Sequence, residues 1–387
     1  MIQRIALAGV ALAMTFGAVG PAAAADPYEI NMITSMTGGA AFLGQREVES
    51  MHALEAMVNK NGGIKGRQIK IVISDDQSNP QVAVQLSSQL AAKKVPFIFG
   101  PSLTAICQAV SGQIDKTGPV SFCLSPTIFP TAGGYTFMGA PSIDDVVPVI
   151  FRYFLSRKLT RLAVITSTDA SGADFERRLA PVLARPEFKD IKIVTSEHFA
   201  PGDLTVAAQL ARVKAANPDG LVTFTVGTPF GTLLKSIHES GLDVPVYGSG
   251  GNFAFAQMQQ YVSFLPKDLV LNGSRGITPD PTATGAIKRA QDQYFAALAA
   301  ANQRSEFAAS IPWDPMMIML EIVRRVGFDA TPDQVHAAME NLKGFSGIEG
   351  TYDFTTHDQR GLGESATALF RYDGAKNEFV QIYPAKR

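Results

Sequence analysis

The stretch at residues 59–80, NKNGGIKGRQIKIVISDDQSNP, contains a helix end, a turn, a strand and the loop that follows the strand. Its three glycines, at positions 62, 63 and 66, suit a chain reversal after a helix, because glycine adopts positive φ without steric cost. The β-branched run at 69–73 predicts a short strand that ends at the acid pair 75–76. Asn79 followed by Pro80 is typical of a helix start, where the missing N–H of proline costs nothing. The stretch therefore predicts one complete helix-to-strand-to-helix unit.

The same alternation of strand and helix continues along the chain. Each strand-like run is apolar throughout, which is typical of parallel strands buried on both faces. The predicted strands are residues 30–33, 69–73, 97–99, 120–124, 161–165, 191–198, 220–225 and 244–248, and helical spacing marks 47–59, 82–93, 147–155, 173–183 and 230–240. These patterns predict an α/β protein with two parallel sheets covered by helices.

The N-terminus has the pattern of an export signal. Arg4 precedes an apolar run at 5–19, and Pro21 and three alanines at 23–25 follow it. A charge, a short apolar core and small residues in that order predict a signal peptide at residues 1–25, cut before Asp26. The alternative is a membrane anchor, but the run is shorter than the ~20 residues that a span needs. No cysteine lies near the cut and no other long apolar stretch is present, so we expect a soluble periplasmic protein that is not inserted in the membrane.

The order of residues at 59–80 also resembles a known family. The sequence NGGI, then GR, a strand, DD and a helix-starting proline is similar to that of type I periplasmic binding proteins, the solute receptors of branched-chain amino acid ABC transporters. The similarity extends from Ile30 to about Pro384. It implies two Rossmann-like lobes joined by three chain crossings, no cofactor, a small-molecule ligand, and the permease subunits of an ABC importer as partners.

Loop-forming residues at 141–145 and 272–281 suggest two of the crossings, and only the resemblance implies a third, near 344–351. With these crossings, lobe I comprises residues 26–141 and 276–345. Lobe II comprises residues 142–275 and 346–387. Each lobe has the size of an ordinary domain.

Charge and motifs disfavour several function classes. The chain has 34 Lys+Arg and 35 Asp+Glu, a net charge of −1, which offers no basic face for nucleic acid. The five histidines are scattered and show no metal-ligand spacing. No GxSxG or GxxxxGK[ST] motif occurs, and Phe253 stands where a dinucleotide-binding fingerprint beginning at Gly248 needs its last glycine. We therefore expect neither an enzyme nor a bound metal.

Cys107 and Cys123 are the only cysteines of the chain. We expect the first near the start of a helix and the second on the following strand, so an oxidising compartment would allow them to form a disulfide. The alternative is two buried thiols that behave as small hydrophobic side chains.

Hydroxyl side chains follow two predicted strands of lobe I, where ligands of open parallel sheets bind. Such hydroxyls, with a helix N-terminus, can hold a carboxylate without any fixed positive charge. The alternative is ordinary helix capping. Both loops match the carboxylate-binding loops of the resembling family. The predicted residues are Ser102, Leu103, Thr104, Ser125, Pro126 and Thr127.

Three loops of lobe II are expected to face them. The predicted residues are Asp169, Ala170, Ser171, Thr225, Val226, Gly227, Gly251, Asn252 and Phe253. In the resembling amino acid receptors a tyrosine stands at the position of Ser171, and an acid for the substrate ammonium stands near Ser249 or Gly250. Both are absent from this chain. A buried ammonium without an anionic partner is costly, so a free amino acid is disfavoured unless Asp169 serves as that partner.

A carboxylate with a bulky apolar body fits these loops better. Phe42, Phe129, Phe253 and Trp313 are candidates to surround such a body, although each can instead be a core residue. The segments 166–172 and 227–231 resemble receptors for aromatic acids of the benzoate and phenylpropanoid kinds. The prediction is a periplasmic receptor for an aromatic acid. The alternatives are a receptor for branched-chain amino acids or small amides, a sensor subunit of the same fold, and an exported hydrolase.

Overall fold

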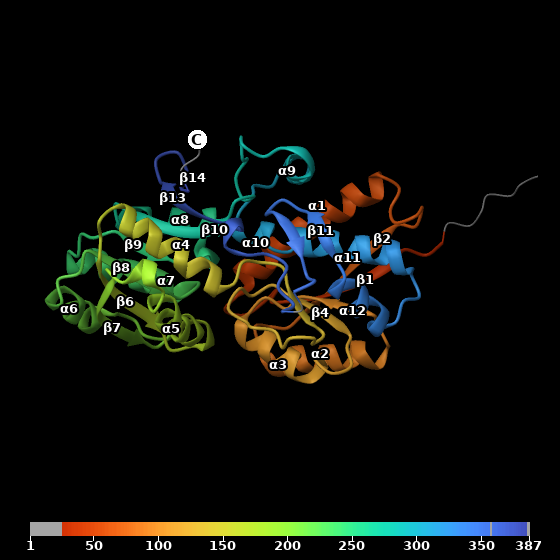
Figure 1. Ribbon diagram of the computed structural model, residues 1–387, viewed down its shortest axis with the longest axis horizontal. Coiled ribbons are helices and arrows are strands. Elements are labelled where there is room, and N and C mark those ends of the chain that lie inside the picture. Colours follow the sequence, from red (N-terminus) through yellow and green to blue (C-terminus); the bar gives the residue numbers. More distant parts are fainter. Residues whose placement is uncertain (1–24, 357, 385–387) are drawn as a thin grey trace, which may run out of the picture.

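The structure is a computed structural model that describes residues 25–356 and 358–384. The expected signal peptide lies almost entirely outside the described residues. Two lobes lie side by side along the long axis of the molecule, each with its own sheet (Figure 1). Within the described part of the chain, no helix combines the length and the apolar character needed to cross a membrane.

Lobe I is built on a five-stranded parallel sheet in the order β2-β1-β3-β4-β5. Its strands are β1 (Tyr28–Thr34), β2 (Ile69–Asp75), β3 (Phe97–Phe99), β4 (Val120–Cys123) and β5 (Thr136–Met138). One face packs against α1 (Ala41–Lys60), α9 (Gly285–Ala300), α11 (Trp313–Val326) and α12 (Pro332–Glu340). The other face packs against α2 (Pro80–Ala92) and α3 (Thr104–Ile114).

Lobe II contains a seven-stranded sheet in the order β14-β13-β10-β9-β8-β6-β7. Its strands are β6 (Arg161–Ser167), β7 (Lys192–Phe199), β8 (Gly220–Phe224), β9 (Val246–Gly248), β10 (Leu269–Ser274), β13 (Thr367–Asp373) and β14 (Glu378–Tyr383). Helices α4 (Ile143–Ser156) and α5 (Ala170–Leu183) cover one face. Helices α6 (Ala207–Ala215), α7 (Thr228–Ser240) and α8 (Phe255–Tyr261) cover the other.

All eight predicted strands are confirmed, and the sheets are mainly parallel as expected. The exception is the edge of the lobe II sheet, where β13 pairs antiparallel with β10 and with β14. Strand β14 has buried and exposed residues side by side, so its sequence lacks the continuous apolar run that marks the central strands.

The unit at 59–80 shows how local sequence produces the fold. The Asn79 side chain accepts a hydrogen bond from the Gln81 N–H at 2.9 Å, with Pro80 at the first position of α2. Gly63 has φ +70°, and a Cβ there would lie 1.9 Å from the Arg67 carbonyl oxygen, so only glycine fits this turn. The glycine turn follows the end of α1 and the Asn79 cap starts α2, so that β2 lies between them.

The third crossing between the lobes lies later in the chain than the sequence suggested. A hairpin of β11 (Lys343–Ser346) and β12 (Thr351–Asp353) follows α12, and its Tyr352 packs in the core of lobe I together with Phe354 and Leu362. Lobe I therefore extends to about Leu362 rather than ending at Phe345. The chain enters lobe II just before β13.

Cys107 on α3 and Cys123 at the end of β4 are joined by a disulfide, with 5.9 Å between their Cα atoms. The bridge lies in a small buried cluster with Ile128 and Met138. It ties the start of α3 to the strand whose end leads into the cleft.

Candidate functional site

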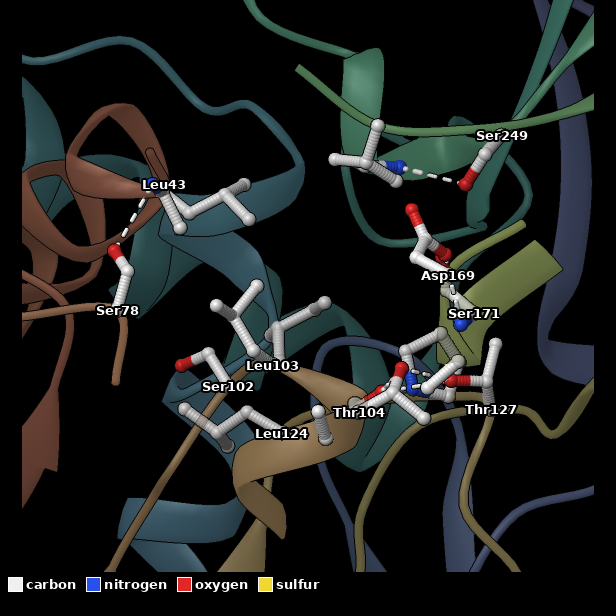
Figure 2. A pocket seen from close by; sticks show the side chains of 18 of the residues that line it. Leu43, Ser78, Ser102, Leu103, Thr104, Leu124, Thr127, Asp169, Ser171 and Ser249 are labelled. Carbon is white, nitrogen blue, oxygen red and sulfur yellow. Dashed lines mark hydrogen bonds between the residues drawn. The ribbon is translucent and has the colours of Figure 1, made fainter. Parts of the chain in front are cut away.

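A cavity of about 400 Å³ lies between the two lobes, at the carboxyl ends of their parallel strands (Figure 2). Lobe I contributes the start of α1 and the loops after β2, β3 and β4. Lobe II contributes the loops after β6, β8 and β9. The short helix α10 (Phe307–Ser310) forms part of the wall, since Phe307 and the following Ile311 both line the cavity.

Three hydroxyl side chains of lobe I come together as predicted from their positions after β3 and β4. Thr104, Ser125 and Thr127, called here the hydroxyl triad, are buried and hydrogen-bonded to one another, with Ser125 Oγ 3.0 Å from both threonine oxygens. All three line the cavity, as do the intervening Pro126 and the neighbouring Leu103. The triad offers rotatable O–H donors to a ligand oxygen.

The hydroxyl triad stands at a helix N-terminus that the protein does not cap. Helix α3 begins at Thr104, and its N-cap residue is Leu103, which makes no side-chain capping hydrogen bond. The first N–H groups of a helix need an external acceptor, and the helix dipole favours negative charge at this end. A ligand carboxylate at this place can accept hydrogen bonds from backbone and hydroxyl donors together.

Ser102 does not join the hydroxyl triad, although the sequence placed it in the same group. Its hydroxyl points away from Thr104 and Thr127 and donates to Glu47 Oε2 at 2.6 Å (Figure 2). Ser102 therefore hydrogen-bonds to Glu47, whereas Thr104, on the other side of Leu103, belongs to the hydroxyl triad. In an extended segment, side chains two positions apart share a face only while the backbone stays regular, and here helix α3 begins in between.

Glu47 is the acid that the sequence analysis missed. It lies on α1, lines the cavity, and is only 2% exposed. Its Oε2 accepts hydrogen bonds from Ser102 and, at 2.6 Å, from the Thr34 hydroxyl of β1. Burial raises the pKa of Glu47 from 4.5 to about 7, opposed by these two hydrogen bonds and assisted by the nearby carboxyl of Asp76.

A signal for Glu47 was present in the sequence. Leu43, Glu47, Met51 and Leu54 recur at spacings of four and three and are all buried on α1. A carboxylate on the apolar stripe of a helix is a polar group that must find partners in the interior.

On the opposite side, Asp169 caps helix α5 of lobe II. Its Oδ1 accepts from the Ser171 N–H at 2.9 Å, the Ser171 hydroxyl at 2.5 Å and the Gly172 N–H at 3.1 Å. Its Oδ2 accepts from the Ser167 hydroxyl at 3.0 Å. Asp169, Ala170 and Ser171 all line the cavity. Lobe II thus presents a helix N-terminus whose need for an acceptor is already met by the protein.

Only part of the predicted set after β8 and β9 reaches the cavity. Val226 and Gly251 line it, together with Ser249. Asn252 is buried beneath these loops, where its Oδ1 accepts from the Gly227 N–H at 3.0 Å and its Nδ2 donates to the Thr225 carbonyl at 2.8 Å. Asn252 therefore holds the two loops together, and Thr225, Gly227 and Asn252 support the wall from behind.

Phe253 lies in the core of lobe II instead of the cavity wall. Its ring packs between Phe370 and Phe379, at centroid distances of 5.1 and 3.6 Å. Trp313 is likewise a core residue, edge-on to Tyr294 at 4.8 Å. The sequence could not distinguish these two rings from pocket rings, because their partners come from distant parts of the chain.

Phe129 and Phe42 lie where the lobes meet. The Arg178 guanidinium of α5 lies 3.2 Å from the ring centroid of Phe129, a lobe I residue outside the cavity lining. Phe42 does line the cavity, and a Cβ on Gly227 of lobe II would lie 3.1 Å from its ring. Another contact across the cleft joins Gln108 of α3 to Asp174 of α5, with Nε2 donating to Oδ2 at 3.0 Å.

The remaining wall is apolar apart from Ser78. Aromatic surface comes from Phe42, Phe224 and Phe307, and the sequence analysis did not anticipate the last two. The aliphatic part consists of Leu43, Leu103, Leu124, Val226 and Ile311.

Among the residues that the structure describes, the acidic side chains that line the cavity are Glu47 and Asp169, and no Lys, Arg or His lines it. In the described ranges, no cluster of three or more His, Cys, Asp or Glu side chains is arranged to hold a metal ion. The cavity therefore combines a largely apolar wall with hydroxyls, a helix N-terminus and two acids.

Comparison with known proteins agrees with this architecture. A sequence profile of the family described as periplasmic binding protein matches residues 27–377. The Leu/Ile/Val-binding protein homolog 3 of Brucella melitensis biotype 1 is 22% identical over 381 residues, which cover 96% of this chain and 97% of that protein.

Two solved structures share the fold. The branched-chain amino acid transporter substrate binding protein LivJ of Streptococcus pneumoniae, in complex with isoleucine, superposes with a TM-score of 0.76 at 18% identity, covering 92% of this chain and 100% of that chain. An ABC transporter solute binding protein of R. palustris, in complex with 4-hydroxybenzoate, has a TM-score of 0.74 at 16% identity and covers 92% and 96%. Because the family profile matches most of the chain, this protein belongs to the periplasmic binding protein family.

Proposed function

We propose that this protein is the solute receptor of a periplasmic ABC importer and that it closes on a small aromatic carboxylate. The observation that carries the proposal is the uncapped N-terminus of α3, which opens beside the hydroxyl triad into a mainly apolar cavity. A ligand carboxylate would serve as the missing cap, with its charge stabilised by the helix dipole and by hydroxyl donors.

The apolar wall supports an aromatic body for that carboxylate. Burial of apolar surface is worth roughly 25 cal/mol per Å², and aromatic rings add edge and stacking contacts with neighbouring rings. Phe42, Phe224 and Phe307 supply such surface from three separate segments. The cavity volume of about 400 Å³ also suits a small ligand, since such sites usually measure about 300–1,000 Å³.

Transport requires that the bound and free receptors differ. The cavity lining comes from both lobes, so a ligand that contacts both favours the closed arrangement over an open one. The closed pair of lobes then presents to the permease subunits a surface that the open form lacks. In this mechanism no covalent bond of the ligand is made or broken.

A branched-chain amino acid is the second candidate, favoured by the position of Asp169. A carboxylate has about four acceptor positions, and within the described residues Asp169 Oδ2 accepts only the Ser167 hydroxyl. That oxygen can therefore still accept from a ligand ammonium. The relative from Brucella melitensis is named for leucine, isoleucine and valine, and the R. palustris neighbour holds an aromatic acid, so relatives of both kinds occur.

A thermal-shift screen of the exported protein separates the two candidates. Benzoate-type and cinnamate-type acids should raise the melting temperature more than leucine, isoleucine or valine at equal concentration, because a ligand stabilises the folded state by RT ln(1 + [L]/Kd). Calorimetric titration of the best ligands gives their dissociation constants. Micromolar binding of leucine with no binding of aromatic acids would replace the proposal with the amino acid alternative.

A further inference from the structure

Glu47 forms a second polar centre in the cavity, distinct from the hydroxyl triad. Its Oε2 accepts both available hydroxyl hydrogens, those of Thr34 and Ser102, each at 2.6 Å. Its Oε1 accepts no hydrogen bond from any described residue, although the side chain lines the cavity and is 2% exposed. Oε1 is not among the fully enclosed oxygens that lack a partner, so a ligand in the cavity can reach it. In this mainly apolar surrounding, a hydrogen bond from the ligand to Oε1 is stronger than the same bond in water.

The two polar centres are separated by apolar side chains. Leu103 and Leu124 lie between Ser102 and Thr104 along the lobe I wall (Figure 2). A ligand that satisfies both centres must therefore carry polar groups at the two ends of an apolar body. A carboxylate fits only one of these ends, because a second one beside Glu47 would meet like charge from Glu47 and from Asp76.

A hydroxyl group suits the Glu47 centre better than other polar groups. An ionised Glu47 only accepts hydrogen bonds, whereas a neutral Glu47 carries its proton on Oε1, since Oε2 is already occupied as an acceptor. A ligand hydroxyl can donate to the first form and accept from the second. A ligand carbonyl suits only the neutral form, and an ammonium suits only the ionised form.

We infer that the ligand carries a hydroxyl at the end of its apolar body opposite the carboxylate, and that Glu47 is the residue that selects for it. This inference rests on the proposed function and narrows it to hydroxylated aromatic acids. Glu47 contacts the ligand directly, while Ser102 and Thr34 hold its carboxyl in place.

Paired ligands test the inference on the unaltered protein. Calorimetry would compare 4-hydroxybenzoate with 4-methylbenzoate, and 4-hydroxycinnamate with 4-methylcinnamate, because a methyl group matches the size of a hydroxyl but makes no hydrogen bond. The hydroxyl form should bind about tenfold or more tightly in at least one pair, as expected for a hydrogen bond to a charged acceptor. A ratio near one in both pairs overturns the inference while leaving the proposed function intact.

Variants then show whether Glu47 is responsible. Glu47→Met keeps the chain length and removes both oxygens, so the hydroxyl preference should fall to near one. Glu47→Gln keeps an acceptor but loses the charge, and should reduce the preference for the hydroxyl acid by about threefold or more. This second variant provides the test if the methionine variant does not fold. Persistence of the full preference in a folded variant overturns the inference.

Asp169→Asn is the matched control, since it removes the other negative charge that lines the cavity. It should change the affinities for the hydroxyl and methyl acids together and keep their ratio. A loss of the hydroxyl preference in this variant instead would assign the selection to Asp169 and overturn the role of Glu47. If the unaltered protein binds no aromatic acid at all, the proposed function and this inference both fall.

Discussion

Glu47→Gln should change how the stability of the protein depends on pH. In the folded protein the pKa of Glu47 is raised from 4.5 to about 7 by burial. Between these two values the folded state holds a proton that the unfolded state has released, so the free energy of unfolding falls as the pH rises through this window. Below pH 4.5 the carboxyl is neutral in both states, and above pH 7 it is ionised in both.

The size of the effect follows from the pKa shift. One pKa unit corresponds to about 1.4 kcal/mol, so the shift of Glu47 amounts to about 3 kcal/mol of stability lost between pH 4.5 and pH 7. Glutamine does not titrate, and its amide can still meet the Ser102 and Thr34 hydroxyls. As the pH is raised from 4 to 8, the free energy of unfolding of the variant should therefore increase by about 3 kcal/mol relative to that of the unaltered protein. A constant difference in stability caused by the substitution itself does not affect this change with pH.

Equilibrium urea unfolding at several pH values measures this difference. Buried acids that do not interact with Glu47 contribute equally to both proteins and cancel in the comparison. Glu49→Gln is the control on the same helix, because the Glu49 side chain is 41% exposed and forms an exposed ion pair with Arg46, and such pairs contribute little. If the Glu47→Gln and unaltered proteins give parallel curves from pH 4 to pH 8, the carboxyl of Glu47 is not held in the environment described above.

Three further predictions concern the cleft. Replacing both Thr104 and Thr127 by valine should weaken carboxylate binding by a few kcal/mol, at about 1.5–3 for each hydrogen bond to a charged group, and unchanged calorimetric affinity would remove the hydroxyl triad from the site. Replacing Cys107 and Cys123 by serine should cost about 3 kcal/mol of stability, as estimated for a loop of about 15 residues; full alkylation of both thiols in unreduced, denatured periplasmic protein would show that no bridge forms. Asp169→Asn should tighten binding of an aromatic acid by about 1 kcal/mol or less, because it removes a partly screened negative charge from the cavity wall, whereas weaker binding of the natural ligand would favour an amino acid.

Much of the fold follows from local patterns in the sequence. Continuous apolar runs identify most of the central parallel strands, and turn residues such as Gly63 and the Asn79 cap separate them. The central strand β10 was nevertheless missed, although all its residues are buried. The antiparallel edge strand β14 was missed because its residues alternate in burial without a marked apolar run. The third crossing was placed inside the β11–β12 hairpin, which put β12 in the wrong lobe, since only its packed rings, such as Tyr352, show which core it joins.

The candidate site was predictable where strand ends bring loops together. The hydroxyl triad follows directly from the rule that ligands of parallel sheets lie beyond the carboxyl ends of the strands. Phe307 was not predictable in this way, because it reaches the cavity from a short helix whose N-terminal N–H donates to the Phe253 carbonyl of lobe II. Phe253 itself occupies the core, since its partners Phe370 and Phe379 come from the edge hairpin.

The contacts between the lobes at the rim of the cleft affect how readily the receptor closes, and not which ligand it prefers. Gln108 to Asp174 and Phe129 to Arg178 join the lobes through protein groups alone, so each contributes equally to closure around any ligand. The apparent dissociation constant is the intrinsic one divided by the fraction of receptors able to bind, and these contacts act on that fraction. Gln108→Ala would therefore weaken every ligand by the same factor and leave their order unchanged. Evolution can in this way adjust the concentration at which the receptor works without changing which solute it accepts.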